Sequence, residues 1–350
     1  MGLKDRLLKN STIKDSASLA ASRLFEKKDI VTLPCKMLNL ATRGDALNGG
    51  FSPGIIQIAA ESKHFKSKFA LEMTKAFLTK FSDGVVIFYD SEYGTPESYF
   101  EGMNVDNIIH TPIVNLEEFK HDIVKQLTEI ERGEKVLILV DSLGNIPSLK
   151  ELSDAEAGKD TQDMTRAKVM KSIFRMIMPL INQKDVYAVM VNHTYKTIEM
   201  YSKDVPTGGT GSIYNSNVIW TISKAKEKEA VTYVNEDGKK KTSDELTGYK
   251  FTLNTYKSRF VKEESKFPIE VRFDTGIGEW SGMFDLAVES GYIRKVTPQT
   301  YARKDVTPDM IEKGTAKAYR RKEIEDNDDY MSALFEETDF NEWLKGEYQI

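Results

Sequence analysis

Short apolar runs alternate with segments of helical periodicity along most of the chain. The apolar runs are continuous, which is the pattern of strands that are covered on both faces. Between them, apolar residues recur with the spacing of amphipathic helices. We therefore predict a largely parallel sheet with helical crossovers. The expected strands are residues 55–59, 85–89, 136–140, 186–191 and 218–222, and the expected helices are 66–81, 97–103, 116–132 and 164–182.

Further patterns extend this outline. Gly133 follows the third expected helix and is predicted to cap its carboxyl end. Two later runs, residues 249–256 and 269–273, alternate apolar and polar positions, which predicts antiparallel additions to the sheet. Residues 235–238, Asn-Glu-Asp-Gly, have the composition of a charged hairpin turn. Residues 1–30 are polar, and their apolar residues have helical spacing.

Two long segments, residues 144–163 and 194–213, fit no helix or strand. Each follows the carboxyl end of an expected strand, which is the edge where open α/β sheets bind ligands. Loops of this length in a compact domain are usually functional or disordered. The second segment has the composition of a flexible, mildly basic platform for nucleic acid. It contains Tyr195, Lys196, Met200, Tyr201 and Lys203, together with Gly208 and Gly209.

Residues 60–67, Ala-Glu-Ser-Lys-His-Phe-Lys-Ser, directly follow the first expected strand. They keep the chemical half of the phosphate-loop pattern G-x-x-x-x-G-K-[ST], while Ala60 and Phe65 stand where glycines are expected. A strand that turns tightly into a helix directs backbone N–H groups and the positive helix end at one point. Lys66 can then reach the β- and γ-phosphates of a nucleotide, and the Ser67 hydroxyl can ligate Mg²⁺.

Polar residues also follow three other expected strands. Asp141 is expected to complete a Mg²⁺ site, and the alternative is a turn cap after the strand. Glu92 can orient and deprotonate an attacking water, a role for which Asp90 competes. His193 is either structural or a sensor that couples the γ-phosphate to the loop that follows it.

Composition narrows the class of protein. The single cysteine, Cys35, excludes an internal disulfide and fits a reducing cytoplasm. The four histidines are scattered and form no zinc pattern with it. The longest apolar runs are too short to span a bilayer, and the amino-terminal residues have no apolar signal core. We therefore expect a cytoplasmic protein that does not act at a membrane.

The net charge of −5 hides an asymmetry along the chain. Residues 323–350 contain ten acidic residues and one lysine, which gives −9 and leaves +4 for residues 1–322. A mildly basic body suits contact with a polyanion, and the acidic tail would compete for that contact or recruit partners. The alternative is a solubilising tail. Against that alternative, the tail contains apolar residues typical of a docking segment, namely Leu334, Phe335, Phe340, Trp343 and Leu344.

Taken in order, these segments resemble the RecA-type strand-exchange recombinases, and specifically those of T4-type bacteriophages. The general resemblance covers residues 35–295, and the phage resemblance begins at residue 1. The phage proteins also have Phe-Lys-Ser where RecA has Gly-Lys-Thr, but they keep a glycine at the position of Ala60. The matching stretches are residues 49–54, 60–67, 89–94, 140–144, 163–168, 192–194, 207–211 and 256–259.

The resemblance implies an α/β fold with a RecA-like P-loop ATPase core, in which helices flank a mostly parallel sheet, over residues 35–280. It also implies an amino-terminal helical arm, residues 1–34, that packs on the next subunit through the segment from Ala20 to Phe25. A small carboxyl-terminal α/β region, residues 281–350, would end in the acidic tail.

The resemblance also implies roles for single residues. Tyr99 would stack on adenine, Glu92 would activate water, and His193 would link the γ-phosphate to the DNA-binding loops 144–163 and 194–213. Lys257 and Arg259 would reach the ATP of the neighbouring subunit. The nucleotide site would comprise Ala60, Glu61, Ser62, Lys63, His64, Phe65, Lys66 and Ser67 with Asp141, and the DNA-contacting residues would be Lys196, Tyr201, Lys203, Gly208 and Gly209.

The implied function is that of an ATP- and Mg²⁺-dependent recombinase. It would form a head-to-tail filament on single-stranded DNA, pair it with homologous double-stranded DNA and exchange strands. Its protein partners would be a loading mediator, a single-strand-binding protein and a helicase. One alternative is a ring-shaped hexameric helicase, against which residues 284–293 argue because they resemble the small carboxyl-terminal region of RecA. The other is a recombinase paralogue that loads filaments without exchanging strands.

Overall fold

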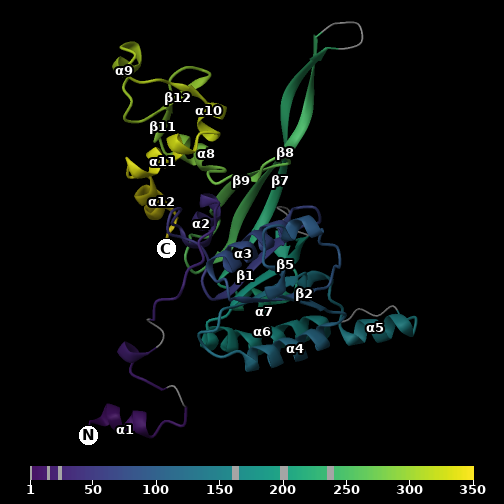
Figure 1. Cartoon of the computed structure of the whole chain (residues 1–350). Helices are drawn as coiled ribbons and strands as arrows, with labels where there is room; N and C mark the ends of the chain where they lie inside the picture. The colour runs from purple at the N-terminus through teal and green to yellow at the C-terminus, as the bar shows by residue number, and fades with distance from the viewer. Residues whose placement is uncertain (1, 14–15, 23–25, 160–164, 198–203, 235–239) are drawn as a thin grey trace.

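The central sheet runs through the whole body of the protein. In the computed structural model, the described residues are 2–13, 16–22, 26–159, 165–197, 204–234 and 240–350. The strand order is β10-β9-β8-β7-β1-β5-β4-β2-β3 (Figure 1). Six strands are parallel to one another: β1 (Gly54–Ala60), β2 (Val85–Asp90), β3 (Ile108–Pro112), β4 (Val136–Asp141), β5 (Tyr187–Lys196) and β7 (Val218–Val234). The predicted, largely parallel α/β sheet is confirmed.

Helices cover both faces of the parallel strands, which explains why their sequences are continuously apolar. On β2, Val86 and Phe88 join the core cluster under one face, while Ile87 and Tyr89 join the cluster under the other. The first face packs against α2 (Lys36–Arg43) and α3 (Lys66–Lys80), and the second against α4 (Leu116–Glu129) and α6 (Thr165–Lys184) (Figure 1). No described helix is both long and apolar enough to cross a bilayer.

Two local expectations are wrong, and one strand was missed. Helix α4 ends at Glu129 with Ile130 as its carboxyl cap, so Gly133 does not cap it. Gly133 has a φ of 104° and serves a separate turn beyond the helix. Residues 97–103 form only a short 3₁₀ helix, η3 (Glu97–Phe100), and not an α-helix. Strand β3 was not predicted because it lies at the sheet edge, where its side chains are largely exposed.

Ordered elements occupy much of the two long segments that were expected to have none. After β4 come η5 (Leu143–Asn145) and α5 (Leu149–Glu156). After β5, strand β6 (Asp204–Pro206) pairs back on the end of β5, and α7 (Gly209–Asn215) follows. Tyr201 and Lys203 lie outside the described residues.

Strands β7 and β8 (Lys240–Ser258) form a long antiparallel hairpin that projects from the body (Figure 1). The pairing continues from Val218–Ser258 to Val234–Lys240, and the expected turn at 235–238 lies outside the described residues. Strand β9 (Lys266–Arg272) pairs antiparallel with β8, and β10 (Gly276–Ile277) with β9. The predicted antiparallel additions are therefore confirmed.

The amino-terminal segment is held on the body by ion pairs that begin at residue 26, after its first two helices. It contains α1 (Leu3–Lys9) and the 3₁₀ helix η1 (Leu19–Ala21), and no described residue among 2–22 is buried. Helix α1 lies away from the sheet (Figure 1). Residues 26–29 are then held on the body by ion pairs: Glu26 with Arg132, Lys28 with Asp185, and Asp29 with Lys135. Phe25 lies outside the described residues.

The carboxyl-terminal region forms a small sheet with surrounding helices. The sheet order is β11-β12-β13, and these strands pair antiparallel. The elements are α8 (Met283–Glu289), β11 (Ile293–Lys295), β12 (Thr300–Arg303), α9 (Pro308–Glu312), β13 (Tyr319–Arg320), α10 (Arg321–Glu325), α11 (Asp328–Glu336) and α12 (Phe340–Tyr348).

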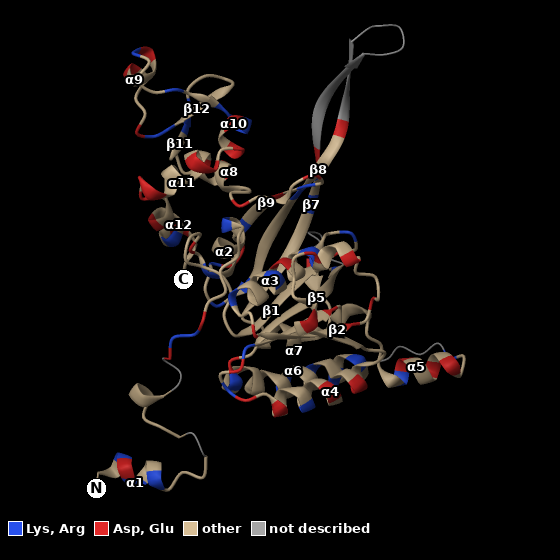
Figure 2. Cartoon of the chain, viewed as in Figure 1, with Lys and Arg blue, Asp and Glu red and all other residues tan. Residues whose placement is uncertain are grey.

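The acidic tail is part of this folded region. Its apolar side chains Leu334, Phe335, Phe340 and Leu344 are buried in the core of the same chain. Acidic and basic residues occur together in this region (Figure 2). Several of the tail's carboxylates form ion pairs within it: Glu337 with Arg303 at 2.6 Å, Asp339 with Lys304 at 2.9 Å, and Glu342 with Lys345 at 2.8 Å. The docking surface for the apolar residues is therefore the protein's own core.

We expect Phe340→Ala to lower the free energy of unfolding by about 3–5 kcal/mol, because the ring is fully buried. Its ring contacts those of Tyr292, Phe335 and Trp343. The control is Asp328→Asn, which removes an exposed charge and should change stability by less than about 0.5 kcal/mol. Urea denaturation measures both, and an equal response of the two variants would contradict the assignment of a packing role to the tail.

Candidate nucleotide site

The turn between β1 and α3 has the shape of a phosphate loop without its glycines. Lys63 and Phe65 adopt left-handed backbone conformations, with φ of 63° and 55°. Phe65 stands at one of the expected glycine positions, where a residue with a side chain costs about 1–2 kcal/mol. Ala60, at the other position, belongs to β1, and its φ is not positive. Only the replacement at Phe65 therefore carries backbone strain.

This turn offers unused hydrogen-bond donors. The backbone N–H groups of residues 62–65 donate to no described residue, and the first turn of α3 leaves further N–H groups without helical partners. Such a group of donors at a helix amino terminus is suited to binding phosphate.

Lys66 lies beneath the loop with 7% of its surface exposed. Its ammonium donates a hydrogen bond to the Glu61 carbonyl at 2.9 Å. Burial lowers the pKa of Lys66, and the nearby carboxylates of Glu92 and Asp141 oppose that shift. No described carboxylate bonds directly to this buried ammonium. A phosphate oxygen would supply such an anionic partner.

Asp141 is the best-supported Mg²⁺ ligand among the predicted residues. It ends β4, is 4% exposed, and accepts a hydrogen bond from Ser67. Its Oδ1 atom is buried without a hydrogen-bond partner among the described residues. Burial raises the pKa of Asp141 to about 6. An unpartnered carboxylate oxygen beside a hydroxyl fits Mg²⁺, which takes one or two protein ligands and completes its shell with water and phosphate.

Glu92 is held by several donors. Its Oε1 accepts hydrogen bonds from Ser142 Oγ and Asn145 Nδ2, both at 2.8 Å, and lies 3.5 Å from His193 Nε2. The contact with His193 lowers the pKa of Glu92, so the carboxylate is ionised at neutral pH and able to act as a base. Ser142 and Asn145 were not predicted, because their role depends on the local path of the chain after β4.

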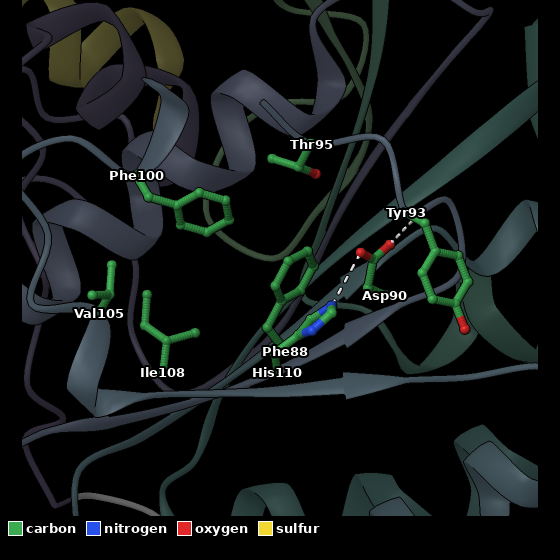
Figure 3. Close-up of a pocket in the computed structure, with 8 residues that line it drawn as sticks. All are labelled: Phe88, Asp90, Tyr93, Thr95, Phe100, Val105, Ile108 and His110. Carbon is green, nitrogen blue, oxygen red and sulfur yellow. Dashed lines mark hydrogen bonds and ion pairs between the residues drawn. The ribbon is translucent and has the colours of Figure 1, made fainter. Parts of the chain in front are cut away.

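Asp90, the other carboxylate that was considered for activating water, makes structural contacts instead. Its Oδ1 accepts hydrogen bonds from the backbone N–H groups of Glu92 and Tyr93, both at 2.9 Å, and its Oδ2 faces His110 Nε2 at 3.2 Å. Figure 3 shows the contacts of Asp90 with Tyr93 and His110 at the edge of a cavity of about 380 Å³ that is lined mainly by apolar and aromatic side chains. Asp90 therefore shapes the turn that presents Glu92.

His193 connects this cluster to both long segments. It ends the core part of β5, and its carbonyl accepts the N–H of Thr207 from the second segment at 2.9 Å. Gly144, in the first segment, lies so close that an added Cβ would be 2.1 Å from His193 Cδ2. Only glycine leaves room for the imidazole there.

Arg166, on α6, holds the start of the first segment. Its guanidinium donates to the carbonyls of Leu143, Gly144 and Ile146 at 2.9–3.1 Å. It lies in the 163–168 stretch that the resemblance identifies, but nothing in the composition of that stretch indicated this contact.

Other predicted residues surround the site. Tyr99, in η3, has the Lys68 ammonium 5.3 Å from its ring centroid. Lys196 forms an ion pair with Glu61 of the phosphate loop at 3.1 Å. His64 contacts the Ser62 carbonyl through Nδ1. Gly208 and Gly209 have positive φ where α7 begins.

Lys257 and Arg259 lie far from this cluster. Ser258 pairs with Val218, which in turn pairs with Ile56 near the amino end of β1, whereas the phosphate loop follows its carboxyl end. The stretch from Ile56 to Ala60 alone spans about 13 Å. Lys257 donates to the carbonyls that end α7, and the exposed Arg259 has no side-chain hydrogen bond or ion pair with a described residue. The structure does not bring this pair to the chain's own phosphate loop.

Comparison with known proteins gives consistent results. Residues 280–344 match the family model "Bacteriophage T4, Recombination and repair protein, C-terminal domain". The chain is 41% identical over 353 residues to the recombination and repair protein of Enterobacteria phage T4, covering 99% of this chain and 86% of that protein. It is 24% identical to Protein RecA of Streptomyces coelicolor, covering 61% of this chain and 53% of RecA, and 23% identical to that of Chloroherpeton thalassium, covering 71% and 65%.

We expect Asp141→Asn to stabilise the nucleotide-free protein more at pH 8 than at pH 5. The raised pKa means that the folded state favours the neutral carboxyl, so stability is lost as pH rises from the unfolded value towards about 6 and above. The variant should gain about 1–3 kcal/mol at pH 8. Urea denaturation without Mg²⁺ measures this difference in the free energy of unfolding. An equal gain at both pH values would contradict the prediction. Mg²⁺ with ATP should stabilise the wild type more than the variant.

We expect Gly144→Ala to displace His193 and raise the pKa of Glu92 towards its ordinary value, because the contact with His193 is the main cause of its lowering. An NMR titration of carboxyl carbons, assigned with Glu92→Gln, measures this pKa. Gly278→Ala is the control, since nothing lies within 4 Å of its added Cβ. A Glu92 titration that is unchanged in Gly144→Ala would show that the imidazole moves without leaving the carboxylate.

Proposed function

The chain belongs to the family of the phage T4 recombination and repair protein, which is similar to bacterial RecA, and we propose from this premise that it is an ATP-dependent DNA recombinase. ATP with Mg²⁺ would bind at residues 60–67 and Asp141. Mg²⁺ would neutralise charge that develops on the phosphates. Lys66 would bind phosphate oxygens, Tyr99 would contact the base, and Glu92 would hold and deprotonate the attacking water.

One observation carries the proposal: the phosphate loop and the pair Lys257 and Arg259 lie towards opposite ends of the parallel strands. The phosphate loop follows the carboxyl end of β1, while Lys257 and Arg259 lie beside the amino end of that strand. The exposed Arg259 side chain is available to a nucleotide held by another copy of the chain. When a surface of one copy binds a different surface of the next copy, the contact is head-to-tail. Repeated contacts of this kind form a helical filament, unless the copies close into a ring.

DNA would bind along the segments that follow β4 and β5. Both start at the nucleotide edge of the sheet and are tied to Glu92 through Asn145, Gly144 and His193. The presence of a γ-phosphate near Glu92 would therefore change the position of His193 and of both segments. Lys196 would have to leave Glu61 in order to contact DNA.

The amino-terminal segment would complete the assembly. The described residues 2–22 contain exposed leucines, namely Leu3, Leu7 and Leu19, which contact no core of their own chain. We propose that this arm packs on a neighbouring subunit. A loading mediator, a single-strand-binding protein, a helicase and homologous double-stranded DNA would be the further partners of a recombinase, acting in the host cytoplasm.

The decisive experiment mixes two inactive variants. Lys66→Ala removes the phosphate contact, and Arg259→Ala removes the cation that would act on the neighbour's ATP. Each alone should hydrolyse ATP poorly in the presence of single-stranded DNA, although Arg259→Ala should still bind nucleotide. An equimolar mixture should regain roughly a quarter of wild-type activity, because that share of random interfaces pairs two intact halves.

Other outcomes exclude the proposal. If Arg259→Ala alone is fully active, or if two variants that are each inactive stay inactive when mixed, the site is not shared between subunits. ATP hydrolysis that ignores DNA would favour a filament-loading paralogue, and strand exchange with labelled oligonucleotides distinguishes that protein from a recombinase. Closed rings in electron micrographs, together with unwinding of forked DNA, would identify a hexameric helicase.

A further inference from the structure

The base of the long hairpin touches the phosphate loop from outside. Lys224, on β7, donates a hydrogen bond from its ammonium to the Lys63 carbonyl at 3.0 Å. The same ammonium lies 3.7 Å from the ring centroid of Tyr249 on β8 and 6.0 Å from that of Phe65. Lys224 therefore contacts the loop at Lys63 and approaches it at Phe65, the two residues with left-handed backbone conformations.

The Phe65 ring is packed against the same hairpin. Its centroid lies 5.2 Å from that of Phe251 and 5.8 Å from that of Tyr249. Phe251 also makes an edge contact with Phe69, one turn into α3. A residue other than glycine keeps a positive φ only when its surroundings hold it in that conformation. These aromatic contacts provide such surroundings for Phe65.

We propose that Lys224 and Tyr249 are positioning residues for the phosphate loop, holding it in the conformation that binds nucleotide. This inference rests on the proposed ATP site. Lys224 acts through the loop, because its ammonium is bonded to a backbone carbonyl and lies over a ring. Tyr249 acts by packing against Phe65 and by placing its ring under the Lys224 ammonium.

The arrangement explains how a loop with no glycine at residue 65 remains functional. A glycine reaches a left-handed conformation without cost and needs no external support. A phenylalanine does not, but its ring can be anchored elsewhere. The anchor here lies on β7 and β8, at the point where the hairpin passes the nucleotide edge of the sheet. Any displacement of the hairpin base would be transmitted to the phosphate loop.

The first test measures the affinity for a fluorescent ATP analogue with Mg²⁺. We expect Lys224→Met to weaken binding about tenfold, the loss typical of one hydrogen bond from a charged donor. The turnover rate at saturating ATP should stay within about twofold, because the change acts on loop position and not on Glu92. Lys224→Arg should recover most of the affinity, and Tyr249→Phe, which keeps the ring, should resemble the wild type.

The matched control is Lys226→Met. Lys226 lies two residues further along β7, is exposed, and has no side-chain hydrogen bond, ion pair or ring contact with a described residue. Its replacement should leave nucleotide affinity within about twofold of wild type. An equal loss in both variants would point to the general charge of the hairpin and would overturn the positioning role.

A double-mutant comparison separates positioning from direct phosphate contact. Phe65→Gly removes both the strain and the ring, so Lys224→Met in that background should weaken binding by less than about threefold. If the loss in the Phe65→Gly background remains tenfold, Lys224 contacts the nucleotide itself, and the proposal is wrong. A loss confined to the turnover rate, with unchanged affinity, would also overturn it.

A readout without nucleotide distinguishes failure of this proposal from failure of the proposed function. Trypsin cleaves after Lys63 only when the loop leaves its held conformation, so cleavage there should be several times faster in Lys224→Met than in Lys226→Met. Mass spectrometry follows the fragment. Equal cleavage rates overturn the positioning role, even if the protein hydrolyses ATP with DNA. Faster cleavage in Lys224→Met supports it, even if the wild type exchanges no strands.

Discussion

The length of one buried strand is the constraint on which the rest of the structure depends. Strand β1 ends in the phosphate loop, and the strands that pair beside it carry Lys257 and Arg259 to its other end. Because a strand is extended, one chain holds its phosphate loop and this basic pair at opposite ends of β1. The parallel strands β4 and β5 bring Asp141 and His193 to the loop's edge for the same reason, since their carboxyl ends lie side by side.

The candidate nucleotide site is energetically costly to maintain in the empty protein. It holds a buried lysine, a buried carboxylate oxygen without a described partner, and a phenylalanine in a left-handed conformation. Each cost falls on a group that a Mg²⁺–phosphate complex or the hairpin base would satisfy. Binding and stability are therefore opposed in the empty protein and aligned in the loaded one.

Sequence patterns predicted the core strands because these strands are apolar on both faces. The phosphate-loop pattern pointed to Lys66 and Ser67, and the places of Glu92 and Asp141 after strands pointed to them. The structure brings these four residues together, and their roles stay a prediction. The patterns missed β3, whose edge position leaves it exposed, and the tail helices, whose charges concealed a buried apolar face. Contacts of Arg166 and Lys224 were out of reach, since each joins segments that only the tertiary fold brings together. Such partners leave no periodic signal in a single sequence.

The packing of the tail has a consequence for the order in which the protein is made. Asn341, near the end of the chain, accepts a hydrogen bond from the Ala46 N–H and donates one to Asp45, while Ile350 donates its N–H to the Phe260 carbonyl. The segment around Asp45 leaves the ribosome early, and Asn341 follows it 296 residues later. The body can therefore complete this part of its core only after Asn341 has emerged, so every nascent chain passes through a period with this surface uncovered.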